Sequence, residues 1–149
     1  MHASIPTTYR GIRFRSRLEA KWAAHADLDG SVRWKYEPIE FPGWIPDFSW
    51  EFIGRSDKPA LVEVKPVYTL ESFLTSADCL KMFDAVLANP LLANNFHGFF
   101  LLGVSPEHVW ANRDFGGNSS RWRQLSLPDI EEQHCWAKAS NITQWKAPQ

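Results

Sequence analysis

Residues 44–52, WIPDFSWEF, decide the fold expected for this chain. Aromatic and polar residues alternate along it in the order Asp47, Phe48, Ser49, Trp50, Glu51 and Phe52. A period of two predicts a strand over Asp47–Ile53, with the aromatic residues on its buried face and Asp47 on the opposite face. Burying an unpaired carboxylate costs several kcal/mol, so Asp47 is expected to be exposed, hydrogen-bonded or matched to a cation.

Residues 60–65, ALVEVK, predict a second strand after the turn-forming residues 54–59, GRSDKP. Glu63 and Lys65 share one face of this strand, while the valines take the other face. A hairpin brings the polar faces of both strands onto the same side of a sheet. Asp47, Glu63 and Lys65 are therefore expected to point the same way.

Further elements are expected on both sides of this hairpin. Capping, periodicity and proline positions predict a helix over Ser16–Leu28, a strand over Val32–Glu37 that continues towards Phe41, one long helix from Thr69 to Asn89, a strand over Phe99–Val104 and a short helix over Pro128–Ala139. The order up to Val104 is helix, three strands, helix and strand. This order predicts an α/β fold with a mixed central sheet flanked by helices.

The composition predicts one domain over residues 1–149, with a core at about 9–104 and a C-terminal extension of loop and helix at 105–149. A chain of 149 residues with 44% hydrophobic residues has enough apolar surface for a compact core. Cys79 and Cys135 form neither a disulfide framework nor a metal-ligand spacing. The sequence has no apolar run that would span a bilayer and no secretion signal, so a cytoplasmic protein without a membrane partner is expected.

The net charge of −1 does not by itself indicate a nucleic-acid-binding protein. The charge is unevenly distributed, however, because seven Lys and Arg residues oppose three acidic residues between Met1 and Lys35. This basic segment predicts either a phosphate-binding surface or an ordinary solvated helix face.

The expected convergence of Asp47 and Glu63 predicts a metal site. Two carboxylates placed close together raise each other's pKa unless a cation lies between them. Mg²⁺ accepts one or two carboxylates and completes its shell with water and substrate phosphate, and the backbone carbonyl of Val64 would add a ligand. Lys65 would orient the attacking water or stabilise charge on the phosphate. Metal-assisted phosphodiester hydrolysis with Mg²⁺ or Mn²⁺ is the chemistry that this set predicts.

A simpler interpretation of the same residues also stands. Glu63 and Lys65 at positions i and i+2 of a strand are common on a solvated polar face. In that case Asp47 would only form an ion pair with Lys65.

The motif Pro46-Asp47 followed by Glu63-Val64-Lys65 resembles the signature of the PD-(D/E)XK nuclease superfamily. Two preceding stretches, YRGIRFRSRLEAKWA at 9–23 and WKYEPIEF at 34–41, resemble the branch that contains phage endonuclease I-type Holliday junction resolvases and the endonuclease subunit of heteromeric transposases. The resemblance covers Tyr9 to about Val104. It implies a restriction-endonuclease-like core of order αβββαβ.

The resemblance also implies a role for residues of the first helix. Glu19 matches the helix glutamate that joins the catalytic site in this branch, although a glutamate at this position also fits a capping box with Ser16. Arg13, Arg15 and Arg17 would contact the DNA backbone, or else they are ordinary surface arginines. Pro66 departs from the branch, which often has a small residue there, and removes a backbone N–H donor.

The function implied is a Mg²⁺-dependent DNA endonuclease selective for branched DNA, working as a homodimer in a bacterial cell or a phage-infected host. Two alternatives remain. The chain is a noncatalytic nuclease-like module that binds nucleic acid or protein, or a nuclease subunit that is active only when a protein partner delivers DNA. Several tryptophans would stack on unpaired bases or, alternatively, pack in the core or at a dimer contact: Trp110, Trp122, Trp136 and Trp145.

Overall fold

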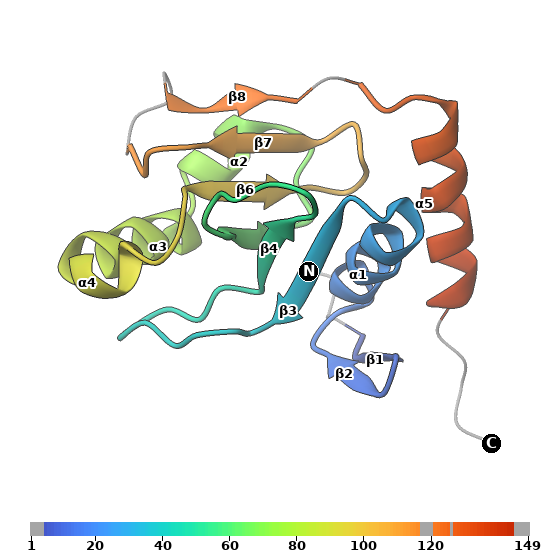
Figure 1. The fold of residues 1–149 in the computed structure, drawn as a ribbon, viewed down its shortest axis with the longest axis horizontal. Helices are drawn as coiled ribbons and strands as arrows, with labels where there is room; N and C mark the ends of the chain where they lie inside the picture. The colour runs from blue at the N-terminus through green and yellow to red at the C-terminus, as the bar shows by residue number, and fades with distance from the viewer. Residues whose placement is uncertain (1–4, 117–120, 126, 145–149) are drawn as a thin grey trace.

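The protein is a mixed α/β structure, described here from a computed structural model that covers residues 5–116, 121–125 and 127–144. Its main sheet has six strands in the order β3-β4-β5-β6-β7-β8 (Figure 1). The strands are β3 (Val32–Tyr36), β4 (Phe48–Phe52), β5 (Ala60–Val64), β6 (Phe99–Leu102), β7 (Val109–Asn112) and β8 (Arg123–Gln124). Only β5 and β6 run parallel to each other; the other neighbouring strands are antiparallel.

Five helices and a small hairpin surround this sheet within the described residues. They are β1 (Thr7–Tyr9), β2 (Ile12–Phe14), α1 (Arg17–Asp29), α2 (Leu70–Leu74), α3 (Ala77–Ala88), α4 (Pro90–Ala93) and α5 (Ile130–Ile142). Figure 1 shows α1 and α5 side by side, and α3 with α4 on the other side of the molecule. None of the helices within the described ranges is both long and apolar enough to cross a membrane.

The predicted helix at the start of the chain and the four predicted strands are confirmed to within one or two residues. Ser16 caps α1, because its hydroxyl accepts the backbone N–H of Glu19 at 3.1 Å. Gly30 ends α1 in the left-handed conformation, with φ of 76°, and its N–H donates to the Ala26 carbonyl. The first of these strands does not continue towards Phe41, because Glu37 has a positive φ of 46° and turns the chain away after Tyr36.

The long helix predicted over Thr69–Asn89 was wrong, because the chain forms the separate helices α2 and α3. The break lies at Thr75 and Ser76. The Ser76 hydroxyl donates to the Phe73 carbonyl at 2.6 Å and accepts the Cys79 N–H at 3.2 Å, so one side chain ends α2 and caps α3. Serine side chains compete with the helical hydrogen bonds in this way, and the apolar periodicity alone does not reveal it.

The sheet has a separate hydrophobic core on each face. On the α1 side, Phe48 and Val62 pack with Phe14 and Trp22, while Leu61 and Phe99 pack with residues of α2 and α3 on the other side. All five residues of β5 are buried. Strand β5, which carries Glu63, therefore lies inside the sheet. It has β4 on one edge and β6 on the other, and helices cover both faces.

The elements after β6 were only partly predicted. Strands β7 and β8 were not expected, whereas α5 begins and ends within three residues of the predicted helix. Trp110 and Trp122 are buried in the core, and Trp136 packs against Trp22 with ring centroids 4.7 Å apart. The packing interpretation is confirmed for these tryptophans, while Trp145 lies outside the described residues.

Candidate functional site

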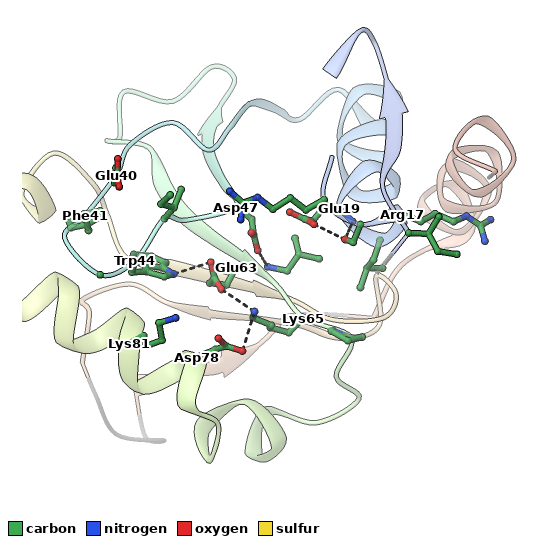
Figure 2. A pocket seen from close by; sticks show the side chains of 18 residues that line it. Arg17, Glu19, Glu40, Phe41, Trp44, Asp47, Glu63, Lys65, Asp78 and Lys81 are labelled. Atoms are coloured by element: carbon green, nitrogen blue, oxygen red, sulfur yellow. Dashed lines mark hydrogen bonds and ion pairs between the residues drawn. The ribbon is translucent and has the colours of Figure 1, made fainter. Parts of the chain in front are cut away.

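A cleft of about 730 Å³ opens where β5 ends, between the N-terminus of α1 and the start of α3 (Figure 2). Most of the residues predicted for the site line it: Arg15, Arg17, Glu19, Asp47, Glu63, Val64 and Lys65. Glu19 approaches from the α1 side, while Asp78 and Lys81 approach from the α3 side. The predicted convergence of Asp47, Glu63 and Lys65 is thus confirmed as a matter of geometry.

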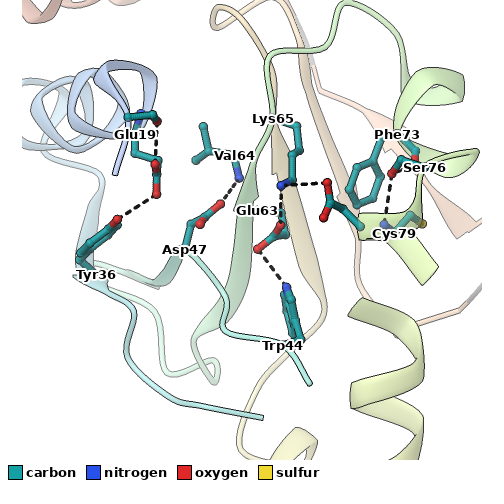
Figure 3. Close-up of polar contacts among 12 residues, drawn as sticks. Glu19, Tyr36, Trp44, Asp47, Glu63, Val64, Lys65, Phe73, Ser76 and Cys79 are labelled. Carbon is teal, nitrogen blue, oxygen red and sulfur yellow. Dashed lines mark hydrogen bonds and ion pairs between the residues drawn. The ribbon is translucent and has the colours of Figure 1, made fainter. Parts of the chain in front are cut away.

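Strand register brings Asp47 and Glu63 together. Phe48 pairs with Val62, so the preceding Asp47 lies level with Glu63 on the adjacent antiparallel strand. The backbone N–H of Val64 donates to Asp47 Oδ2 at 2.8 Å, as Figure 3 shows. The carboxyl group lies in the wall of the cleft, and the residue is only partly exposed. Burial of this group, reinforced by the charges of Glu63 and Glu19, raises the pKa of Asp47 well above its usual value.

Glu63 is the more deeply placed of the two acids, with 5% of its surface exposed. Such burial excludes the solvated-face interpretation for Glu63. Its Oε1 accepts a 3.1 Å hydrogen bond from Nε1 of Trp44. Burial raises the pKa of Glu63 to about 7, although the charge of Lys65 and the Trp44 hydrogen bond favour the ionised form.

Lys65 lies between two carboxylates. Its Nζ is 3.2 Å from Asp78 Oδ2 and 3.8 Å from Glu63 Oε2. Burial alone would lower the pKa of Lys65, but the charges of Glu63, Asp78 and Asp47 outweigh burial and raise it. Within the described residues, Lys65 forms no ion pair with Asp47, so the simple Asp47–Lys65 pair considered above was wrong.

Glu19 is held at the first turn of α1 by two hydroxyl groups. Ser16 Oγ donates to Glu19 Oε2 at 2.6 Å, and the Tyr36 hydroxyl donates to Oε1 at 3.0 Å. The cap therefore uses the Ser16 side chain, and the carboxylate faces the cleft beside Asp47 (Figure 3). Only 6% of Glu19 is exposed, so this acid is fixed in place before any ligand arrives.

The three predicted DNA-contacting arginines have different surroundings. Arg15 is exposed at the rim of the cleft and forms an ion pair with Glu37 at 2.8 Å. Arg17 turns away from the acids, and its Nε donates to the Thr143 carbonyl at 3.2 Å, which ties α1 to the end of α5. Arg13 is exposed on β2 and does not line the cleft.

The sequence did not single out Trp44, Asp78, Tyr36 or Lys81, although these residues complete the surroundings of the predicted set. Trp44 follows a turn in which the N–H groups of Phe41 and Trp44 each donate to the other residue's carbonyl, at 2.9 and 3.0 Å. Asp78 looks like an ordinary acid in the first turn of a helix. No local pattern distinguishes these residues, because their roles depend on contacts between distant segments.

A divalent ion in this cleft would take its protein ligands from the carboxylates. Across the described ranges, no three His, Cys, Asp or Glu side chains are grouped so as to hold a metal ion. A pair of carboxylates is nevertheless sufficient for Mg²⁺, which keeps several waters and uses substrate oxygens. Asp47 and Glu63 form such a pair, because they lie level on adjacent strands and both line the cleft. The role of the Val64 carbonyl stays a prediction.

Comparison with protein-family models, with curated proteins and with solved structures found no match for this chain. The resemblance to PD-(D/E)XK nucleases therefore stays a prediction, and the functional conclusion rests on the cleft itself.

Proposed function

We propose that the protein is a Mg²⁺- or Mn²⁺-dependent endonuclease that hydrolyses phosphodiester bonds in DNA. One observation carries the proposal: two acids, the partly exposed Asp47 and the buried Glu63, lie level on adjacent strands in one cleft, with the ammonium group of Lys65 3.8 Å from Glu63. The order α1, β3, β4, β5, then the helices α2 to α4, then β6 supports the restriction-endonuclease-like core that belongs to this proposal.

The electrostatics of the cleft favour a bound cation. Five acids line the cleft: Glu19, Glu40, Asp47, Glu63 and Asp78. Of the four lining cations, Arg15 forms an ion pair with Glu37 and Arg17 donates to the Thr143 carbonyl, which leaves Lys65 and Lys81 to offset the acids. Burial is the main cause that raises the pKa values of Asp47 and Glu63, and the charges of neighbouring acids add to the rise. A divalent ion restores the balance, and when bound it would polarise a phosphodiester oxygen and favour ionisation of the attacking water.

Each residue of the site has a separate task in this proposal. Asp47 and Glu63 bind the cation, and the hydrogen bonds from Val64 and Trp44 fix the direction of their carboxylates. Lys65 is kept protonated by its acidic neighbours, so its ammonium group stabilises negative charge that develops on the phosphate. Glu19 lies across the cleft and orients water or a further cation.

The proposed substrate is branched DNA, recognised by shape. A chain of 149 residues leaves little room for a separate base-reading module beside this cleft. Arg15 and Lys81 line the rim on opposite sides of the acids and would contact flanking phosphates. Paired cuts across a junction would require a homodimer, so the proposal includes one.

The test is a cleavage assay on four-way junctions, flaps and linear duplex in Mg²⁺, in Mn²⁺ and in EDTA. We expect metal-dependent nicks near the branch point, which are lost in Asp47→Asn and Lys65→Ala. Asp84→Asn serves as the matched control, because Asp84 is exposed on α3 and does not line the cleft.

Two other outcomes would redirect the proposal. Intact substrates, together with DNA binding that is unchanged in Asp47→Asn, would indicate a noncatalytic binding module. Cleavage that appears only after a protein partner is added, and that the same substitution abolishes, would indicate a nuclease subunit.

A further inference from the structure

Three partly exposed aromatic side chains gather at the end of β5 that lies away from the cleft. Trp50, Phe52 and Phe100 come from β4 and β6 on the α1 side of the sheet. Their ring centroids are 5.4 Å apart for Trp50 and Phe100, 5.5 Å for Phe52 and Phe100, and 6.4 Å for Trp50 and Phe52. We call this group the aromatic platform.

A second cavity, of about 200 Å³, lies against the platform and has a basic rim. Phe52 and Phe100 line it, together with the exposed cations Arg55, Lys58 and Arg113. Asp57 is the single acid among its lining residues. In the part of the chain that the structure describes, none of the three cations forms an ion pair with a carboxylate.

The position of Arg55 links the basic rim to the aromatic rings. Its guanidinium carbon lies 5.5 Å from the centroid of the Phe52 ring, within the range of a cation–π contact. The Lys58 ammonium group donates a 2.5 Å hydrogen bond to the Asn94 carbonyl, which fixes its position. Charges held beside an aromatic surface in this way suit a ligand that has both a flat π-system and negative charge.

We propose that the aromatic platform binds an unpaired nucleotide of a single-stranded nucleic acid. The base stacks on Phe52 and Phe100, and the flanking phosphates contact Arg55, Lys58 and Arg113. Stacking on aromatic side chains combined with a cationic path for the backbone is the general way in which proteins hold single strands. Three cations against one acid give the rim the charge that complements phosphate.

This site is separate from the cleft and does not rest on the proposed function. Ala60 lines the platform cavity and Val64 lines the cleft, so the two sites lie at opposite ends of one strand. At about 3.3 Å per residue, four residues of strand separate them by about 13 Å along β5. A strand held on the platform leaves the acidic cleft free.

The experiment measures fluorescence anisotropy of a labelled oligothymidylate of about twelve nucleotides, in EDTA so that no cleavage occurs. Phe52→Leu keeps an apolar side chain but removes the π face, and we expect it to weaken binding about fivefold or more. Lys58→Ala combined with Arg113→Ala should also lower the dependence of log Kd on log salt by about 0.7 for each cation lost.

The control is Lys138→Ala, which removes an exposed cation from α5, far along the chain from the platform. It should bind as the unmodified protein does, and thermal melts should show that every variant is folded. Binding is measured in EDTA and cleavage in Mg²⁺, so loss of cleavage and loss of platform binding are separate results. Wild-type affinity in Phe52→Leu, equal weakening in Lys138→Ala, or tighter binding of a duplex of the same length would each overturn the proposal.

Discussion

Lys65 lies closer to Asp78, an acid from α3, than to Glu63, its neighbour on β5: the Nζ to oxygen distances are 3.2 and 3.8 Å. The ion pair with Asp78 joins the central strand to the helix that covers it. Asp78 thereby holds the ammonium group at the mouth of the cleft and limits its contact with Glu63.

The first prediction concerns this ion pair. Asp78→Asn removes the charge that holds Lys65 outward, and we expect the cleavage rate to fall about tenfold, because a small displacement of a catalytic group is costly. The effect should appear in kcat with little change in KM. Asp78→Glu should restore most of the rate, and Asp84→Asn on the same helix should change nothing; a rate equal to wild type in Asp78→Asn would rule out the positioning role.

The second prediction concerns the hydrogen bond from Trp44 to Glu63. Trp44→Phe keeps an aromatic ring but removes the indole N–H, so the carboxylate loses the donor that fixes its direction. Partners of this kind typically change metal affinity by about 10- to 100-fold. Calorimetric titration with Mn²⁺ should show this weakening. Trp136→Phe, at the contact between α1 and α5, is the control and should titrate as the wild type does.

The third prediction concerns the pH dependence of stability without metal. The folded-state pKa of Glu63 is raised to about 7 from an ordinary value near 4.5, so between these values the folded state binds more protons than the unfolded state. Glu63 therefore stabilises the fold fully below about pH 4.5, and this contribution is lost as pH rises towards 7. A shift of this size corresponds to about 3 kcal/mol.

Thermal melts in EDTA from pH 5 to pH 8 measure this loss. The stability of Glu63→Gln minus that of wild type should increase from pH 5 to pH 8, because glutamine does not ionise. Saturating Mg²⁺ should raise the melting temperature of the wild type most at high pH. Parallel curves for wild type and variant would contradict the prediction.

The fourth prediction separates the capping and catalytic roles of Glu19. Ser16→Ala removes the cap of α1 and should cost about 1 kcal/mol of unfolding free energy with a small effect on cleavage. Glu19→Gln retains one oxygen that accepts from a hydroxyl, and its NH2 group can donate to the other hydroxyl, so stability should change less, while cleavage should fall at least tenfold. Urea unfolding and cleavage rates measured on both variants test this; a Glu19→Gln variant that is less stable but equally active would make Glu19 a purely structural residue.

Local patterns predicted the part of the site that belongs to neighbouring strands. The alternation around Asp47 and within residues 60–65 was sufficient to place Asp47, Glu63 and Lys65 together, because a hairpin has few possible registers. Ser16 and Gly30 similarly marked both ends of α1.

Contacts between distant segments were beyond such reasoning. Asp78 meets Lys65 only because α3 packs on the sheet, and Tyr36 meets Glu19 only because β3 lies beside α1. The parallel pairing of β6 with β5 likewise joins segments that are far apart in the sequence. The extent to which Asp47 and Glu63 are buried also depends on how the sheet and helices pack. Strand alternation predicts only which face of the sheet a side chain occupies.

The hydrogen bond from the Val64 N–H to Asp47 means that one carboxylate both terminates a β-ladder and faces the cleft. The printed pairing of β4 with β5 ends at Phe48 and Val62, and beyond it the Asp47 side chain is the acceptor of the Val64 N–H. Protonation of Asp47, or a cation drawn to it, changes the acceptor strength felt by that amide. The exchange rate and chemical shift of the Val64 amide proton are thus intrinsic reporters of cleft occupancy, readable by NMR without any label placed in the site.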